Sequence, residues 1–144
     1  MDTAAPETVL HATCVADAEG RALLILGPSG SGKSGLALQM MALGARLVAD
    51  DRTIVTDAGD HLAASCPAAT RGLIEARGIG LLRAQVLRSA RVTLAVDLSE
   101  AEGDRLPERR KIVFLGHEVD LVRGPVTAHL PAALMLYLAE GRQE

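Results

Sequence analysis

The stretch GPSGSGKS, residues 27–34, decides the fold of this chain. It follows ALLIL (22–26), a continuous apolar run typical of a buried strand, and it leads into KSGLALQMMALG (33–44), where apolar residues recur at helical spacing. A strand, a glycine-rich loop and a helix in this order match the pattern G-x-x-x-x-G-K-[ST] in full. A glycine-rich turn that matches by chance is the alternative, but it would require neither flanking element. We therefore predict a phosphate-binding loop over residues 27–34.

Lys33 explains why the loop is built this way. Lys33 and Lys111 are the only lysines in the chain, and all other cationic side chains apart from histidine are arginines. Glycines allow consecutive N–H groups to turn inward around an anion, and the helix that follows adds its N-terminal dipole. A lysine is a compact charge that reaches the β- and γ-phosphates of a nucleotide, and the hydroxyl of Ser34 suits Mg²⁺. We expect ATP to be bound by Gly27, Pro28, Ser29, Gly30, Ser31, Gly32, Lys33 and Ser34.

An acidic pair follows the next short apolar stretch, in VADD (48–51). A carboxylate at the tip of a buried strand beside a phosphate loop can bind Mg²⁺ or accept a proton from a hydroxyl nucleophile. Adjacent side chains on a strand point to opposite faces, so Asp50 and Asp51 should have different roles. The alternative is a solvated turn before the next strand.

The rest of the chain indicates one mixed α/β domain over residues 1–144, with a loose start at 1–7. Apolar and β-branched runs predict many short strands, and PAALMLYLAEG (131–141) predicts a second helix with proline in its first turn. The strands are expected at 9–15, 22–26, 46–49, 53–56, 61–65, 91–99, 111–116 and 117–122, with two more within 66–87. There are too many strands for a plain strand–helix alternation, so we expect a mixed sheet.

Composition excludes several classes of function. The net charge of −3 gives no broad basic surface for nucleic acid, and only Phe114 and Tyr137 are aromatic, so bases have no stacking platform. No apolar run approaches the roughly 18 residues that span a membrane, and the N-terminus lacks a basic, apolar leader. Cys14 and Cys66 are read as reduced thiols. We therefore expect a cytoplasmic protein without a nucleic-acid or membrane partner.

Two segments resemble HPr kinase/phosphorylase, the bacterial enzyme that phosphorylates a serine of the phosphocarrier HPr. One is GPSGSGKSGLALQMMALGARLVADD (27–51), and the other is LIEARGIG (73–80), which resembles that family's L-E-x-R-G-x-G signature. The resemblance covers roughly residues 9–106. It implies a P-loop-containing mixed β-sheet with flanking helices, similar to phosphoenolpyruvate carboxykinase, and it implies ATP and Mg²⁺ as cofactors.

The resemblance also implies roles for individual residues. Lys33 and Ser34 would hold phosphates and Mg²⁺, Asp51 would be the base that takes the proton of the substrate serine, and Glu75 would be a further Mg²⁺ ligand beside Asp50. His11 matches a family histidine, although here alanine follows it where the family has glycine. Arg105 resembles an arginine that steadies the transferring phosphate. Taken alone, Glu75 with Arg77 would be a surface charge pair, His11 a structural histidine and Arg105 a solvated loop residue.

Two departures from the family pattern bear on function. Gly35 stands where the family usually has Glu, and GPVTAHLPA (124–132) lacks a family Gly-Arg-Asn stretch that serves phosphorolysis and subunit contacts. We therefore expect a protein serine kinase acting on an HPr-like phosphocarrier, with better support for phosphorylation than for the reverse phosphorolysis. A homo-oligomer stays open. The alternatives are a nucleotide-binding regulatory module with little catalysis and a small-molecule kinase.

Overall fold

The structure is a computed structural model that describes residues 5–144. Its strands in that range are β1 (Glu7–Leu10), β2 (Ala12–Ala16), β3 (Arg21–Leu26), β4 (Arg46–Ala49), β5 (Thr53–Asp57), β6 (Leu62–Ser65), β7 (Leu73–Ala76), β8 (Gly80–Arg83), β9 (Ser89–Ala101), β10 (Arg110–Phe114) and β11 (His117–Gly124). The helices are α1 (Lys33–Ala42), the short 3₁₀ helix η1 (Ala68–Thr70) and α2 (Leu130–Glu140). No helix within residues 5–144 is both long enough and apolar enough to cross a membrane.

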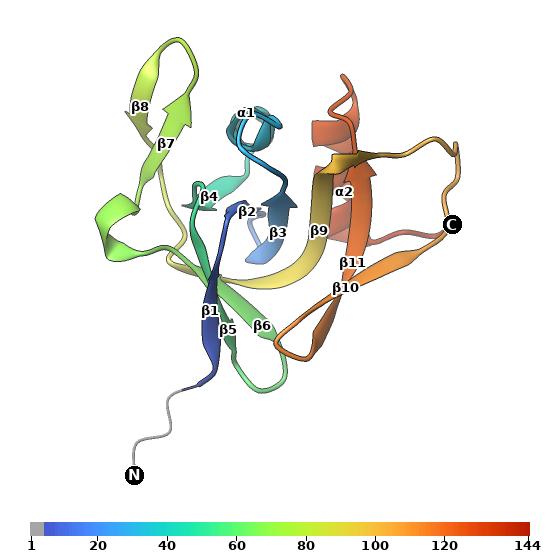
Figure 1. Cartoon of the computed structure of the whole chain (residues 1–144), viewed down its shortest axis with the longest axis horizontal. Helices are drawn as coiled ribbons and strands as arrows, with labels where there is room; N and C mark the ends of the chain where they lie inside the picture. Colours follow the sequence, from blue (N-terminus) through green and yellow to red (C-terminus); the bar gives the residue numbers. More distant parts are fainter. Residues whose placement is uncertain (1–4) are drawn as a thin grey trace.

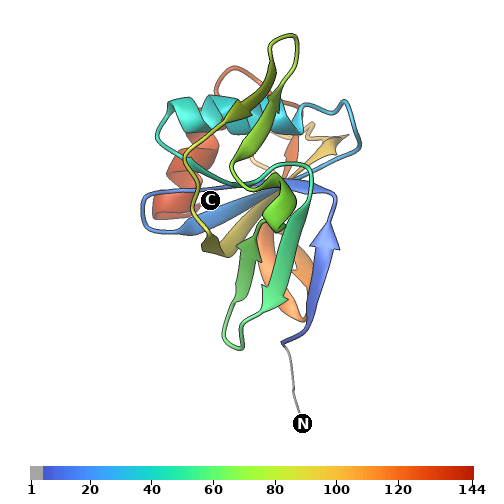
Figure 2. The same cartoon turned by 90° about the vertical axis from the view of Figure 1, so that its left-hand side faces the viewer.

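Most strands form one mixed sheet in the order β1-β5-β6-β9-β3-β2-β4, and β11 and β10 branch from β9 (Figure 1). The long strand β9 runs parallel to both β3 and β11 and antiparallel to β6. Strand β9 therefore connects one half of the sheet, formed by β1, β5 and β6, to the other half, formed by β3, β2, β4, β10 and β11. Strands β7 and β8 form a separate hairpin that projects from the body of the molecule beside α1 (Figures 1 and 2).

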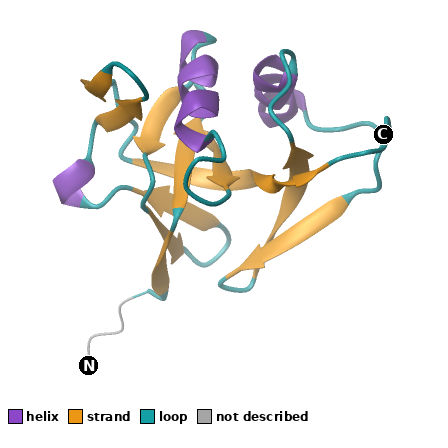
Figure 3. Ribbon diagram, turned by 45° about the horizontal axis from the view of Figure 1, so that its top comes forward, coloured by secondary structure: helices purple, strands orange, loops and turns teal. Residues whose placement is uncertain are grey.

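The central strand β3 is apolar throughout because both of its faces are buried. Leu23 and Ile25 pack in one core with residues of α1 and α2, such as Met40 and Leu134. Both helices lie on this side of the sheet (Figure 3). Leu24 faces the opposite way and belongs to a second core on the other face of the sheet. Burial of both faces fixes the position of the end of β3. The loop 27–32 that follows β3 leads directly into α1.

The mixed α/β class, the strand–loop–helix unit and the second helix are confirmed. The prediction of one strand over 9–15 is wrong, because the chain leaves the sheet at His11. Leu10 pairs with Thr53 on one strand, whereas Ala12 pairs with Leu26 on another. The loose start at 1–7 also ends earlier than predicted, since Glu7 belongs to β1; residues 1–4 lie outside the described part of the chain.

Candidate active site

The loop between β3 and α1 depends on glycine at both of its ends. Gly27 has φ of 149°, and a Cβ added there would lie 2.5 Å from the Oγ of Ser31, which folds back over it. Gly32, the N-cap of α1, has φ of 101°, which lies in the left-handed region that disfavours other residues. The glycines of the sequence pattern thus allow the loop to close tightly onto the start of the helix.

Lys33 lies inside this loop. The residue is only 6% exposed, and its Nζ donates hydrogen bonds to the carbonyl oxygens of Gly27 at 2.8 Å and Pro28 at 3.1 Å. These acceptors are neutral, and Lys33 forms no ion pair with any residue in the range 5–144. A buried ammonium without a carboxylate partner attracts an anion strongly, because little water screens its charge.

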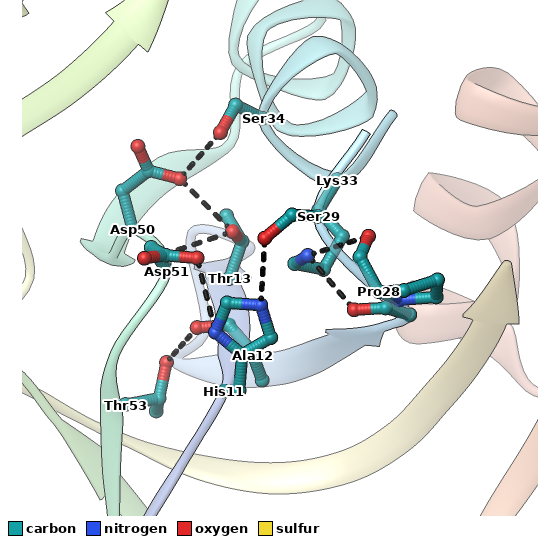
Figure 4. A network of polar contacts seen from close by, with 11 residues as sticks. His11, Ala12, Thr13, Pro28, Ser29, Lys33, Ser34, Asp50, Asp51 and Thr53 are labelled. Carbon is teal, nitrogen blue, oxygen red and sulfur yellow. Dashed lines mark hydrogen bonds and ion pairs between the residues drawn. The ribbon is translucent and has the colours of Figure 1, made fainter. Parts of the chain in front are cut away.

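Asp50, just beyond β4, connects three elements (Figure 4). Its Oδ1 accepts hydrogen bonds from the hydroxyls of Ser34 at 2.7 Å and Thr13 at 2.9 Å. Its Oδ2 accepts a hydrogen bond from the backbone N–H of Glu75 at 3.0 Å. One carboxylate therefore positions the first turn of α1, strand β2 and the β7–β8 hairpin relative to one another.

Asp51 has different partners from its neighbour. Its φ of 67° is unusual for a residue other than glycine, and its N–H donates to Thr13 Oγ1 at 3.2 Å. The Asp51 carboxylate points toward His11, whose Nδ1 lies 3.2 Å from Asp51 Oδ1 (Figure 4). His11 Nε2 in turn lies 3.5 Å from the hydroxyl of Ser29. The side chains of His11 and Asp51 are 50% and 59% exposed, so a second molecule can reach this carboxylate.

A cavity of about 420 Å³ joins the loop, the acidic pair and the β7–β8 hairpin. This volume lies within the range of roughly 300–1,000 Å³ typical of ligand sites. Its walls bring together Lys33, Ser34, Asp50, Asp51 and Glu75, all predicted from the sequence as site residues. The cavity therefore places a cation, a hydroxyl and three carboxylates around one space.

Three further residues show how far the sequence alone identified the residues around the cavity. Arg105 lies exposed in the loop between β9 and β10 and is not among the residues that line the cavity. Arg77, which belongs to the LIEARGIG segment but was given no role of its own from the sequence, lines the cavity wall. Thr13 was not predicted at all, although its hydroxyl contacts both aspartates. A threonine within an apolar strand carries no local signal of such a contact.

The oxygen atoms at one end of the cavity suit Mg²⁺. Mg²⁺ prefers oxygen ligands and is usually held by one or two carboxylates together with substrate phosphates. Ser34 and Asp50 are already hydrogen-bonded to each other, and Glu75 lines the same cavity. In residues 5–144 no three His, Cys, Asp or Glu side chains form a self-sufficient metal cluster. The oxygen donors of Ser34, Asp50 and Glu75 fit a metal that is also held by the phosphates of a nucleotide.

Several known proteins are similar to this chain. The family model of the HPr serine kinase C-terminal domain matches residues 2–136. The chain is 35% identical to the HPr kinase/phosphorylase of Caldanaerobacter subterraneus subsp. tengcongensis, with 94% of this chain and 48% of that protein covered. It is 36% identical to the HPr kinase/phosphorylase of Geobacillus kaustophilus, with 94% and 47% covered. The chain thus spans about half the length of these relatives.

A solved structure supports the same assignment. The Hpr(Ser) kinase/phosphatase of Coxiella burnetii superposes with a TM-score of 0.76 at 26% identity, covering 92% of this chain and 93% of that chain. The match extends over both halves of the mixed sheet and confirms the fold predicted from the loop and its flanking elements. On the family match and on these relatives, the chain belongs to the HPr serine kinase C-terminal domain family.

Proposed function

We propose that this chain is an ATP-dependent protein kinase domain that phosphorylates a serine of an HPr-like phosphocarrier. The observation that carries the proposal is the single cavity shared by Lys33 and by an accessible carboxylate, that of Asp51. The first group can bind the transferring phosphate, and the second can receive the proton of an incoming hydroxyl. The names of the relatives supply the class of acceptor.

The loop and Lys33 would bind the phosphates of the nucleotide. The Nζ of Lys33 donates to two loop carbonyls, and a triphosphate would offer it charged acceptors in their place. The N–H groups of the loop and the start of α1 would stabilise the negative charge that develops on the transferred group. Gly27 and Gly32 already close the backbone of the loop, so the change on binding would be mainly the exchange of acceptors at Lys33.

The metal site completes the phosphate site. Ser34, Asp50 and Glu75 are the residues that would hold Mg²⁺ at the cavity wall. A metal held there would supply positive charge to the phosphate oxygens of the nucleotide. Asp50 also orients the Ser34 hydroxyl through their hydrogen bond.

Asp51 would accept the proton of the carrier serine. The serine oxygen of the carrier forms a bond to the γ-phosphorus, the bond from that phosphorus to the bridging oxygen of ADP breaks, and the serine proton passes to the Asp51 carboxylate. His11 positions this carboxylate through the contact at 3.2 Å. In the reverse direction, the protonated carboxyl returns the proton to the serine oxygen.

We also place the reaction in the cytoplasm, where Cys14 and Cys66 would stay free, as they are here.

The test is to incubate the chain with Mg²⁺-ATP and an HPr-type carrier and to measure the intact mass of the carrier. We expect one added phosphate on a carrier serine, and loss of that addition in Lys33→Ala and in Asp51→Asn. Lys111→Ala and Asp60→Asn are matched controls, since Lys111 and Asp60 are exposed and do not line the cavity. Both controls should phosphorylate the carrier as the parent chain does.

Three results would contradict the proposal. Full activity of Asp51→Asn would remove the assigned proton acceptor. ATP binding without any phosphate on the carrier would favour the nucleotide-binding regulatory module, and turnover of a metabolite without a labelled protein would favour a small-molecule kinase.

A further inference from the structure

Thr13 is a fully buried threonine in β2, a strand whose other residues are apolar. Valine has nearly the same shape as threonine, and both are favoured in strands, so packing alone does not require a hydroxyl at this position. A buried hydroxyl costs free energy unless it is hydrogen-bonded. The partners of the Thr13 hydroxyl therefore indicate what the residue does.

These partners are the two acidic residues of the candidate site (Figure 4). The hydroxyl donates a hydrogen bond to Asp50 Oδ1 at 2.9 Å, and its oxygen accepts one from the backbone N–H of Asp51 at 3.2 Å. The contacts can form because Cys14, next to Thr13 on β2, pairs with Ala49 at the end of β4. One hydroxyl thus joins the side chain of a proposed metal ligand to the backbone of the proposed proton acceptor.

The two aspartates depend on this hydroxyl to different degrees. The Asp50 carboxylate has two other donors, the Ser34 hydroxyl at 2.7 Å and the Glu75 N–H at 3.0 Å, so its position would survive the loss of one contact. Within residues 5–144 the Asp51 N–H has no acceptor other than Thr13 Oγ1. The φ of Asp51, 67°, is costly for a residue with a Cβ and persists only where the surroundings hold it.

The side chain of Asp51 has little else to hold it. Its carboxylate contacts His11 Nδ1 at 3.2 Å, but about half of each side chain is exposed. An ion pair between exposed side chains fixes their positions only weakly. The place of the carboxylate therefore depends also on the backbone to which it is attached, and the hydrogen bond to Thr13 anchors that backbone.

We propose that Thr13 is a positioning residue for the phosphoryl transfer. Its oxygen holds the Asp51 backbone in the left-handed conformation, and its hydroxyl hydrogen binds Asp50, so the proton acceptor is kept at a fixed place relative to the metal ligand. The inference rests on the proposed function only for the role given to Asp51. A hydroxyl that served stability alone would affect the reaction no more than any other buried hydroxyl nearby.

Thr53 supplies the matched control for that comparison. It is also fully buried, and its hydroxyl donates to the Ala12 carbonyl oxygen at 2.8 Å but contacts neither aspartate. Thr13→Val and Thr53→Val each remove one buried hydroxyl and keep the shape of the side chain, whereas Thr13→Ser keeps the hydroxyl.

Three measurements on the whole chain are compared among these variants. The first is kcat with Mg²⁺-ATP and an HPr-type carrier. The second is the Kd for Mg²⁺-tripolyphosphate, which has the phosphates of ATP without its nucleoside and so reports the phosphate loop alone. The third is amide hydrogen exchange at Asp51 relative to Leu24, which lies in the central strand β3 and reports global unfolding.

In Thr13→Val we expect kcat to fall about tenfold to a hundredfold, as is typical when the support of a reacting group is lost, with the Kd for tripolyphosphate nearly unchanged. Exchange at Asp51 should become faster than the change at Leu24 accounts for. Thr13→Ser should restore the parent behaviour in all three measurements. Thr53→Val should keep the parent kcat, although it is less stable.

Several outcomes would overturn the inference. They are the parent kcat in Thr13→Val, an equal fall of kcat in Thr53→Val, and a loss of tripolyphosphate binding that matches the loss of kcat. If the parent chain transfers no phosphate to the carrier, the proposed function is contradicted, and exchange then decides whether Thr13 anchors Asp51. Faster exchange at Asp51 in Thr13→Val alone would support the anchoring, and an equal rise at Asp51 and Leu24 would overturn it.

Discussion

The carboxylate of Asp50 accepts a hydrogen bond from the hydroxyl of Ser34 at 2.7 Å, joining the end of one strand to the first turn of the helix after the phosphate loop. The same carboxylate oxygen accepts from Thr13, and its other oxygen accepts from the N–H of Glu75. Two proposed metal ligands are thus already in contact, and a third is fixed nearby through its backbone. Asp50 is therefore hydrogen-bonded both to the helix that follows the phosphate loop and to the β7–β8 hairpin, which forms the opposite wall of the cavity.

Asp50→Asn should weaken nucleotide binding in a Mg²⁺-dependent way. An asparagine can accept the hydrogen bonds of one carboxylate oxygen, but its amide N–H₂ then faces another donor, the Glu75 N–H or the two hydroxyls. We expect the Kd for ATP in Mg²⁺ to rise about tenfold or more, as is typical when a metal ligand or its support is lost. Titrations with and without EDTA measure this effect. An equal loss of affinity in both conditions would contradict a role in metal binding, and Asp60→Asn should change neither value.

Thr13→Val should destabilise the fold without changing side-chain shape. Thr13 is fully buried, and its hydroxyl donates to Asp50 and accepts from the Asp51 N–H. Loss of the hydroxyl leaves that N–H without its partner, which costs about 1–3 kcal/mol of unfolding free energy. Denaturant unfolding measures the cost. The exposed Thr8 on β1 provides the control, because Thr8→Val should be neutral; equal stability of both variants would show that the Thr13 hydroxyl has no structural role.

Gly27→Ala should disrupt the phosphate loop through a specific clash. A Cβ at this position would lie 2.5 Å from the Oγ of Ser31 and 3.1 Å from its Cβ. We expect lower stability and weaker tripolyphosphate binding, and partial recovery in the double variant with Ser31→Ala, which removes the nearer atom. Recovery should be incomplete, since the φ of 149° stays unfavourable for alanine. The control is Gly103→Ala, where an added Cβ meets no atom within 4 Å and φ is not in the positive region.

Tyr137 provides a spectroscopic test of how α2 docks. Its hydroxyl donates to Asp120 Oδ2 at 2.9 Å, and burial together with that carboxylate raises its pKa to about 12 from the ordinary value of 10. Because the chain has one tyrosine and no tryptophan, phenolate absorbance reports this group alone. At about pH 11, where a free tyrosine is mostly ionised, we expect the folded chain to show little phenolate.

The same shift predicts a loss of stability at high pH. Since the pKa is raised in the folded state, the contribution of Tyr137 is present below its unfolded value of 10 and is lost as the pH rises toward 12. Asp120→Asn should move the titration toward the ordinary value. Ordinary titration of the parent chain while its circular dichroism stays native would contradict the docked geometry.

His117 and Asp57 join the β10–β11 hairpin to β5, with His117 Nε2 and Asp57 Oδ1 2.8 Å apart. The hydrogen bond from His117, aided by the Gly59 N–H, lowers the pKa of the Asp57 carboxyl below its ordinary value of 3.8. The lowered folded pKa means that this stabilisation is present above 3.8 and is lost as the pH falls through the folded value. Asp57→Asn should therefore lower Tm at neutral pH, and this effect should shrink as the pH is lowered below 3.8. An effect on Tm that is the same at neutral and at acid pH would contradict this link.

Local patterns in the sequence were enough for the centre of the fold. The glycine-rich loop with its apolar strand and its helix is specified over about twenty consecutive residues, because turn chemistry and hydrophobic period act at short range. Different roles were expected for Asp50 and Asp51 because side chains alternate along a strand, but both residues lie just beyond β4. Their side chains have different partners, and Asp51 has a positive φ that strand alternation does not predict. The break at His11 could not be predicted in this way. Extended residues on its two sides look alike until their pairing partners are known.

The tertiary structure alone decided what surrounds the loop. Thr13 reaches both aspartates because β2 pairs with β4, and Arg77 reaches the cavity because the β7–β8 hairpin is held to Asp50 through Glu75. Val126 and Leu98 meet α1 only because β11 runs beside β9. These contacts join residues far apart in sequence, so no short-range rule encodes them. Short-range patterns in the sequence were therefore enough to predict the loop at which we propose that phosphate binds, whereas the packing of the sheet places the side chains around that loop.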